Sequence, residues 1–188
     1  MMENDDTMKI VYFRNRGFGT SLKQQADDSK EYLRQKENGN LEKARLLGEQ
    51  IAEFVTKEED FYGLSGMNEL FVQEELQVRQ LLCYAMIASL PGAIHIPLVA
   101  DAVESDFLQA LKRHSPELYR QFAEGSSYTM YLLSKHRGRE PELEAGKTFA
   151  VLCGLDSDAV TVEYGETLYS LTAFALSEMV KQTGFTGE

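Results

Sequence analysis

The sequence predicts an all-α fold, a compact bundle of about seven helices, and three observations lead to it. Apolar residues recur at three- to four-residue spacing along most of the chain, which is the period of a helix face. No convincing run of alternating apolar and polar residues predicts a sheet. Residues 80–100 contain no charged side chain, although 26% of all residues are charged. Exposing this much apolar surface to water is unfavourable. The stretch is therefore predicted to form the middle of the core.

A membrane-spanning role for the same stretch is the alternative, and its prolines argue against it. Pro91-Gly92 is predicted to break the helix near its midpoint, and Pro97 to break it again. The unbroken part, residues 81–90, is about half of the roughly 20 apolar residues that a spanning helix needs. We therefore expect no contact with a membrane.

The N-terminal part of the chain divides into an arm and a pair of helices. Residues 1–19 show no helical pattern and are predicted to be a poorly ordered arm, which leaves residues 20–188 as a single helical domain. Residues 21–37 form a polar helix, and residues 41–57 form a second helix with a stronger apolar stripe. Because Asn38-Gly39-Asn40 separates them, the two are predicted to form an N-terminal helical hairpin.

Five further helices follow in the remaining chain. They are predicted over residues 67–89, 98–113, 116–137, 142–153 and from 156 or 157 to 183. Ser115-Pro116 is typical of a helix start, because proline fits the first helical position. The helix that begins there is predicted to be interrupted or weakened near Gly125-Ser126-Ser127. Gly154 and Gly184 follow the last two helices, as expected of residues that end a helix.

Composition and charge narrow the functional classes. A chain of 188 residues that is 43% hydrophobic supports one sizeable core. Thirty acidic against 19 basic residues give a net charge of −11, which repels nucleic acid, so no nucleic-acid partner is expected. Residues 1–8 are polar and acidic, unlike a secretory signal, and Cys83 and Cys153 have the apolar neighbours of reduced thiols. Both observations predict a cytoplasmic protein.

Motifs for catalysis or metal binding are incomplete. Gly146-Lys147-Thr148 matches the end of a phosphate-binding loop, but Pro141 occupies the position of its first glycine and no apolar strand precedes it. Acidic pairs at helical spacing, such as Glu163 with Glu166, are expected by chance among 30 acidic residues. No Glu-x-x-His sequence accompanies them, as a di-iron bundle requires. The sequence therefore predicts no catalytic residue, metal or cofactor, and whether the chain is an enzyme stays open.

One candidate ligand site lies between the central helices. His95 is in the uncharged turn, where a buried imidazole would need a hydrogen-bond partner. Tyrosines with helical spacing could line a pocket near it, although such stripes are more often edges of a core. The candidate ligand-binding residues are His95, Tyr84, Tyr128, Tyr131, Tyr164 and Tyr169. They support the alternative function, a small-molecule-binding protein or enzyme.

The other candidate site is the dense basic segment Lys135-His136-Arg137-Gly138-Arg139. In an acidic chain it is either a solvated helix end or a contact for an anion or an acidic partner, including another copy of the chain. Since no set of residues typical of a reaction is complete, the sequence favours a non-catalytic protein-interaction or scaffolding module that self-associates. The polar first hairpin and the helical surface are its predicted contact regions.

Overall fold

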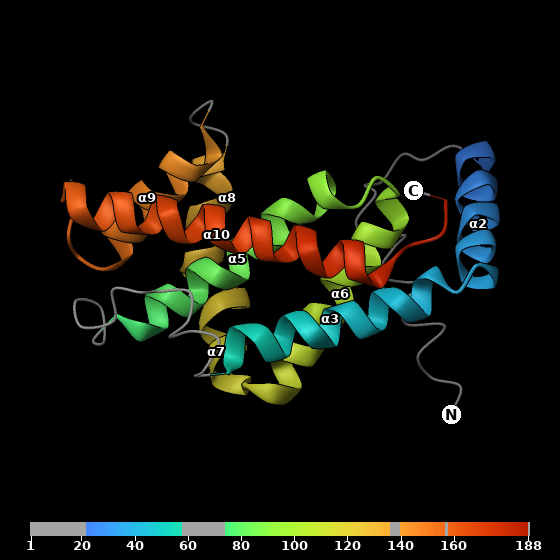
Figure 1. Ribbon diagram of the computed structural model, residues 1–188, viewed down its shortest axis with the longest axis horizontal. Helices are drawn as coiled ribbons and strands as arrows, with labels where there is room; N and C mark the ends of the chain where they lie inside the picture. Colours follow the sequence, from blue (N-terminus) through green and yellow to red (C-terminus); the bar gives the residue numbers. More distant parts are fainter. Residues whose placement is uncertain (1–21, 58–73, 136–139, 157, 188) are drawn as a thin grey trace.

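The computed structural model describes residues 22–57, 74–135, 140–156 and 158–187, and Figure 1 shows their arrangement. These residues form eight helices and no strand, which confirms the all-α prediction. The helices are α2 (Leu22–Glu37), α3 (Asn40–Thr56), α5 (Glu75–Ala93), α6 (Pro97–His114), α7 (Pro116–Ala123), α8 (Ser126–Lys135), α9 (Pro141–Leu152) and α10 (Ala159–Thr183).

Helix α10 runs along most of the molecule, with α8 and α9 at one end and α2 at the other (Figure 1). The most extensive contacts are those of α3 with α6, α9 with α10, and α5 with α10. Helix α5 contributes the centre of the core, because Leu81, Cys83 and Met86 have no exposed surface. Most of the uncharged stretch is thus buried in the bundle, while its turn at Pro91-Gly92, His95 and Pro97 is exposed. Among the described helices, none is long and apolar enough to cross a membrane.

The predicted break at Pro91-Gly92 is wrong, because α5 continues through Pro91 to Ala93. A proline inside a helix removes one hydrogen bond, here the bond to the carbonyl of Ile87 four residues earlier. The ladder then resumes, since the N–H of Ile94 donates to the carbonyl of Leu90 at 2.8 Å. The chain turns at residues 94–96, and Pro97 begins α6, in accord with the preference of proline for the first helical turn.

The helix predicted over residues 116–137 is interrupted near Gly125, one of the two predicted outcomes there, and consists of two helices, α7 and α8. Between them, a Cβ atom on Gly125 would lie 2.2 Å from the carbonyl oxygen of Gln121, so the chain can fold back this tightly only at glycine. The hydroxyl of Ser127 donates to that same oxygen at 3.2 Å. This break raises the helix count from the predicted seven to eight in the described residues.

The connection of α2 to α3 occurs where it is predicted. Gly39 has the left-handed φ of 76° that lets the chain reverse between them. Helix α2 packs through Tyr32 against Leu41 and Leu98, but the main partner of α3 is α6. The buried Asn40 also anchors the C-terminus, since its side chain accepts from the N–H of Thr186 at 2.8 Å and donates to the carbonyl of Thr186 at 2.9 Å.

Candidate functional site

Three of the predicted pocket tyrosines meet in the core, one from each of α5, α8 and α10. The rings of Tyr84 and Tyr131 stack with centroids 4.6 Å apart and an angle of 12° between their planes. Tyr169 lies 6.1 Å from Tyr84 on the ring centroids. All three side chains are buried. This tyrosine cluster is therefore packed ring against ring in the hydrophobic core.

The hydroxyl groups of the buried tyrosines are protonated over the physiological pH range. Burial raises the pKa of Tyr84 to about 12 and that of Tyr164 to about 12. It raises the pKa of Tyr131 well above its ordinary value. Within the described part of the chain the hydroxyl of Tyr131 has no hydrogen-bond partner, which is rare for a buried polar group.

The two other predicted tyrosines have different neighbours. Tyr164 on α10 packs beside Phe149 of α9, with ring centroids 5.8 Å apart. Tyr128 on α8 packs beside Phe122 at 5.0 Å and donates from its hydroxyl to the carboxylate of Glu104 at 3.4 Å. Burial is the main cause of the raised pKa of Tyr128, and the Glu104 charge adds to it.

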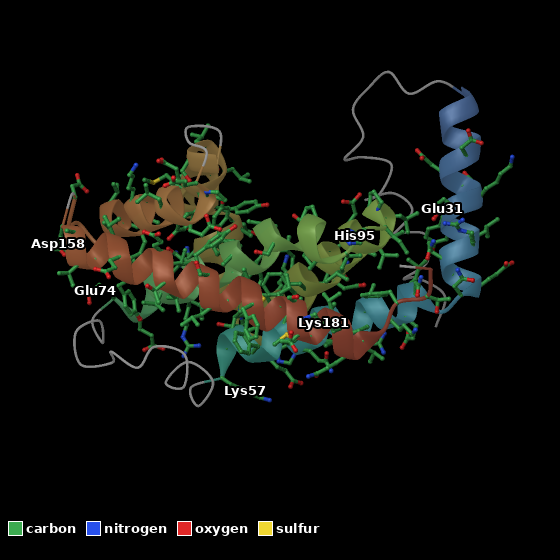
Figure 2. All side chains as sticks on the ribbon, turned by 45° about the horizontal axis from the view of Figure 1, so that its top comes forward. Glu31, Lys57, Glu74, His95, Asp158 and Lys181 are labelled. Carbon is green, nitrogen blue, oxygen red and sulfur yellow. The ribbon has the colours of Figure 1, made fainter. Side chains whose placement is uncertain are left out.

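His95 is exposed rather than buried. It lies in the turn between α5 and α6, and Figure 2 shows it in the part of the molecule that faces α2. Tyr84 is nine residues before the end of α5, a distance of about 13 Å at the rise of an α-helix. The arrangement therefore separates His95 from the tyrosine cluster along α5.

The basic segment 135–139 begins at the last residue of α8, and residues 136–139 lie outside the described residues. A contact through Lys135, His136, Arg137 or Arg139 thus stays a prediction. Earlier on α8, Leu132 and Leu133 are 39% and 54% exposed. Sequence spacing did not single out these two exposed leucines.

The contact of α9 with α10 depends on two glycines. A Cβ atom on Gly146 would lie 2.4 Å from the carbonyl oxygen of Val162, and one on Gly165 would lie 3.0 Å from the Cα of Gly146. The two backbones therefore touch, which no larger residue allows at these positions. The sequence predicts an ordinary helix segment around Gly146 but does not predict that this glycine packs against α10.

A groove of about 610 Å³ lies against this helix pair, and we call it the α9–α10 groove. Its apolar lining is Val151, Ala159 and Val162, and its charged lining is Lys147, Asp156, Glu163 and Glu166. The ammonium group of Lys147 pairs with Glu144 at 2.8 Å. The three acidic side chains of the groove have no basic partner in the parts of the chain that the structure describes. A lining of apolar side chains and unpaired carboxylates suits a ligand that has both apolar and cationic groups.

Hollows of about 300 and 390 Å³ lie elsewhere on the described surface. The smaller is lined by residues of α6 and by Tyr119 of α7. The larger is lined mainly by polar residues of α5, of α7, of α8 and of the turn between α7 and α8, together with Leu76 of α5 and Leu152 of α9. None of the tyrosines predicted to line a pocket lines either of these two hollows or the α9–α10 groove.

Acidic residues at the contact of α3 with α6 are arranged differently. Glu49 bonds to Arg113 and lies 3.1 Å from the Nε2 of His114. Burial by itself would raise the pKa of Glu49. The interactions with His114 and Arg113 together have the larger effect, so the pKa of Glu49 is lowered. The Oδ2 of Asp106 is buried without a partner in the described residues, and burial raises the pKa of Asp106 to about 6.

In the described residues, no group of three or more His, Cys, Asp or Glu side chains is placed to hold a metal ion. No protein-family model, no curated protein and no solved structure matches this chain.

Proposed function

We propose that this chain is a non-catalytic protein-interaction module that self-associates. The observation that supports the proposal is the distribution of exposed apolar side chains. Of the nine large ones in the described residues, seven lie on or beside α8, α9 and α10. These seven are Leu132, Leu133, Val151, Leu155, Val160, Leu171 and Phe174. Apolar surface gathered on one part of a molecule marks a region that another protein covers.

The reactive groups support a binding role over a catalytic one. Burial raises the pKa of the Cys153 thiol to about 12, with Glu74 adding to the shift, and raises the pKa of Cys83 further. Neither thiol is a nucleophile near neutral pH, because the thiolate is the reactive form. The tyrosine hydroxyls are protonated for the same reason. From residue 27 onward, where its side chains are described, the polar helix α2, a predicted contact region, contributes one exposed large apolar side chain, Leu33.

Light scattering on a sizing column over a range of concentrations tests the proposal. The measured mass should rise with concentration to that of a dimer or a larger assembly. The double variant Leu171→Gln with Phe174→Gln should have a lower mass at the same concentration, because it removes apolar side chains from the surface of α10, where Phe174 is 66% exposed. The matched control is Leu33→Gln with Leu46→Gln, which removes two exposed apolar side chains from α2 and α3. A monomer at every concentration would reject self-association.

A second candidate function, small-molecule binding, is favoured by one observation, the unpaired buried hydroxyl of Tyr131. A ligand with a polar atom beside this hydroxyl would satisfy it, and a ligand selective for the folded state raises thermal stability. A panel of metabolites should then raise the Tm of the wild type and raise that of Tyr131→Phe less. Flat unfolding curves across the panel would count against this function.

A further inference from the structure

We propose that the hollow of about 390 Å³ beside the start of α8 binds a small α-amino acid. The carboxylate of the ligand accepts hydrogen bonds from the backbone N–H groups that begin α8, and its ammonium group donates to the side-chain oxygen of Gln80. The hollow shares no residue with the exposed apolar side chains on which the proposed self-association depends. The two proposals can therefore fail independently.

The acceptor side of the hollow is the amide of Gln80 on α5. This side chain lines the hollow although it is only 6% exposed. Its Nε2 donates to the carbonyl oxygen of Gln121 at 3.5 Å, and its Oε1 accepts no hydrogen bond from the described part of the chain. The Oε1 of Gln121, which also lines the hollow, is buried without a partner among the described residues. Because buried polar atoms are nearly always hydrogen-bonded, these oxygens indicate a ligand that brings donor groups.

The donor side is the first turn of α8. The N–H groups of Ser126 and Ser127 have no acceptor within the described ranges. The residue that precedes the helix, Gly125, has no side chain to cap them, and a Cβ there would lie 2.2 Å from the carbonyl oxygen of Gln121. A capping side chain therefore does not fit, and the fold leaves these donors to a ligand. N–H groups at the positive end of a helix bind carboxylates favourably.

The two sides meet at one atom, the carbonyl oxygen of Gln121. The Nε2 of Gln80 donates to it at 3.5 Å, and the hydroxyl of Ser127 donates to it at 3.2 Å. Ser127 is 4% exposed, so two almost fully buried polar side chains line the hollow from different helices. The acceptor on α5 and the donors on α8 are therefore within reach of a single small molecule.

The rest of the lining fits a zwitterion with an aliphatic side chain. Arg120 and Glu124 add one positive and one negative charge at exposed positions, and Leu76 and Leu152 add apolar surface. Arg120 is already paired with Glu117 at 2.7 Å, so the N–H groups of α8 are the main donors to a carboxylate. A simple anion would leave the glutamine oxygens without donors, and a simple cation would leave the N–H groups without an acceptor. An amino acid satisfies both.

NMR titration of the full chain with each of the twenty common L-amino acids tests the site. Each is added to about 10 mM, which fills most of a site with a Kd of about 1 mM. At least one should shift the backbone amide signals of Ser126 and Ser127 and the side-chain amide signal of Gln80 more than other signals. Its methyl ester lacks the carboxylate and its N-acetyl derivative lacks the ammonium group. Each should bind at least about tenfold more weakly, because charge-assisted hydrogen bonds are lost.

Two variants each remove one side of the site. Gln80→Leu removes the acceptor, and its control Gln109→Leu makes the same change at an exposed position of α6 outside this hollow. Ser126→Pro removes an N–H group, and proline fits because it begins α6, α7 and α9 at the same helical position. Its control Ser126→Ala keeps the N–H. Gln80→Leu and Ser126→Pro should raise the Kd at least about tenfold, and the controls should change it less than about twofold.

The outcomes separate the parts of the proposal. Amide signals of Ser126, Ser127 and Gln80 that move with none of the amino acids overturn the site. An N-acetyl derivative that binds as tightly as the amino acid shows a carboxylate site only and overturns the role of Gln80. A methyl ester that binds as tightly overturns the role of α8, and so does an equal loss of affinity in Ser126→Pro and Ser126→Ala. Self-association is measured by light scattering without ligand, so its failure leaves this site in place.

Discussion

The two tightest helix contacts, α3 with α6 and α9 with α10, use the same packing device on different surfaces. In each, a glycine allows backbone contact: a Cβ on Gly48 would lie 2.7 Å from the backbone nitrogen of Phe107, and one on Gly146 would lie 2.4 Å from the carbonyl oxygen of Val162. Close packing is therefore common to both. What differs is the pairing of the charges around them.

Around α3 and α6, most exposed charges are neutralised within the chain. Glu42 pairs with Arg45 at 2.7 Å, and Glu49 bonds to Arg113 beside His114. Around the α9–α10 groove, the carboxylates of Asp156, Glu163 and Glu166 have no described basic partner. A surface whose charges are already paired gains little from a charged ligand, whereas unpaired carboxylates attract one. The two helix pairs thus resemble each other in packing and differ in how far their carboxylates are paired within the described chain.

The largest effect should come from filling the two glycine contacts. Gly48→Ala and Gly146→Ala should each destabilise the fold by about 1–3 kcal/mol, because a methyl group overlaps backbone atoms. At this chain length, that lowers the Tm by roughly 2–4 °C per kcal/mol. The proposed self-association uses exposed side chains on and beside α8, α9 and α10, so only Gly146→Ala, which shifts α9 relative to α10, should also weaken it.

Gly92→Ala is the matched control, because nothing lies within 4 Å of a Cβ at Gly92 in α5. This change should leave stability the same or raise it by up to about 1 kcal/mol, because alanine is the better helix former. Calorimetry and light scattering on the three variants check these results. Equal loss of association in Gly48→Ala and Gly146→Ala would remove the distinction between the two helix pairs.

A smaller, pH-dependent effect is expected at the α3–α6 contact. Burial raises the pKa of Asp106 from 3.8 to about 6, although Arg45 and Arg113 act against it, while Glu49 and Glu42 add to it. Between pH 4 and 6 the folded state therefore binds more protons than the unfolded state, so wild-type stability falls as the pH rises. Asp106→Asn should be more stable by about 1–2 kcal/mol at pH 7.5, with the advantage vanishing towards pH 4.

Urea unfolding at several pH values measures this difference. Asp27→Asn, which removes an exposed carboxylate from α2, is the control and should show no such dependence. If Asp106→Asn were less stable than the wild type at pH 7.5, the buried Oδ2 would have to be hydrogen-bonded in solution.

The smallest effect should separate paired from unpaired carboxylates. Glu49→Gln should cost about 0.5–1 kcal/mol, because Arg113 and His114 lose their partner. Glu163→Gln should change stability by less than about 0.5 kcal/mol, since no described basic side chain depends on it. Chemical unfolding in low and high salt checks both, and the cost of Glu49→Gln should shrink at high salt. A larger cost for Glu163→Gln would mean that the groove carboxylates support the fold.

The sequence by itself determined the helical class, the burial of residues 80–87 in the core and the places where several helices begin or end. Those features depend on local chemistry: the apolar spacing of a helix face, Pro97 and Pro116 at helix starts, and left-handed glycine at Gly39 and Gly184. Local chemistry alone was insufficient at Pro91, where contacts around α5 keep the helix intact for three more residues.

Only the tertiary structure decided which faces meet. It placed Gly146 against Val162, exposed His95, and joined Tyr84 with Tyr131 and with Tyr169 in one cluster. Sequence spacing cannot determine these contacts, because each joins residues from different helices or depends on what covers a turn. The α9–α10 groove was hidden for the same reason: Glu163 and Glu166 look like a chance acidic pair until a second helix, held close by two glycines, supplies the apolar floor beside them.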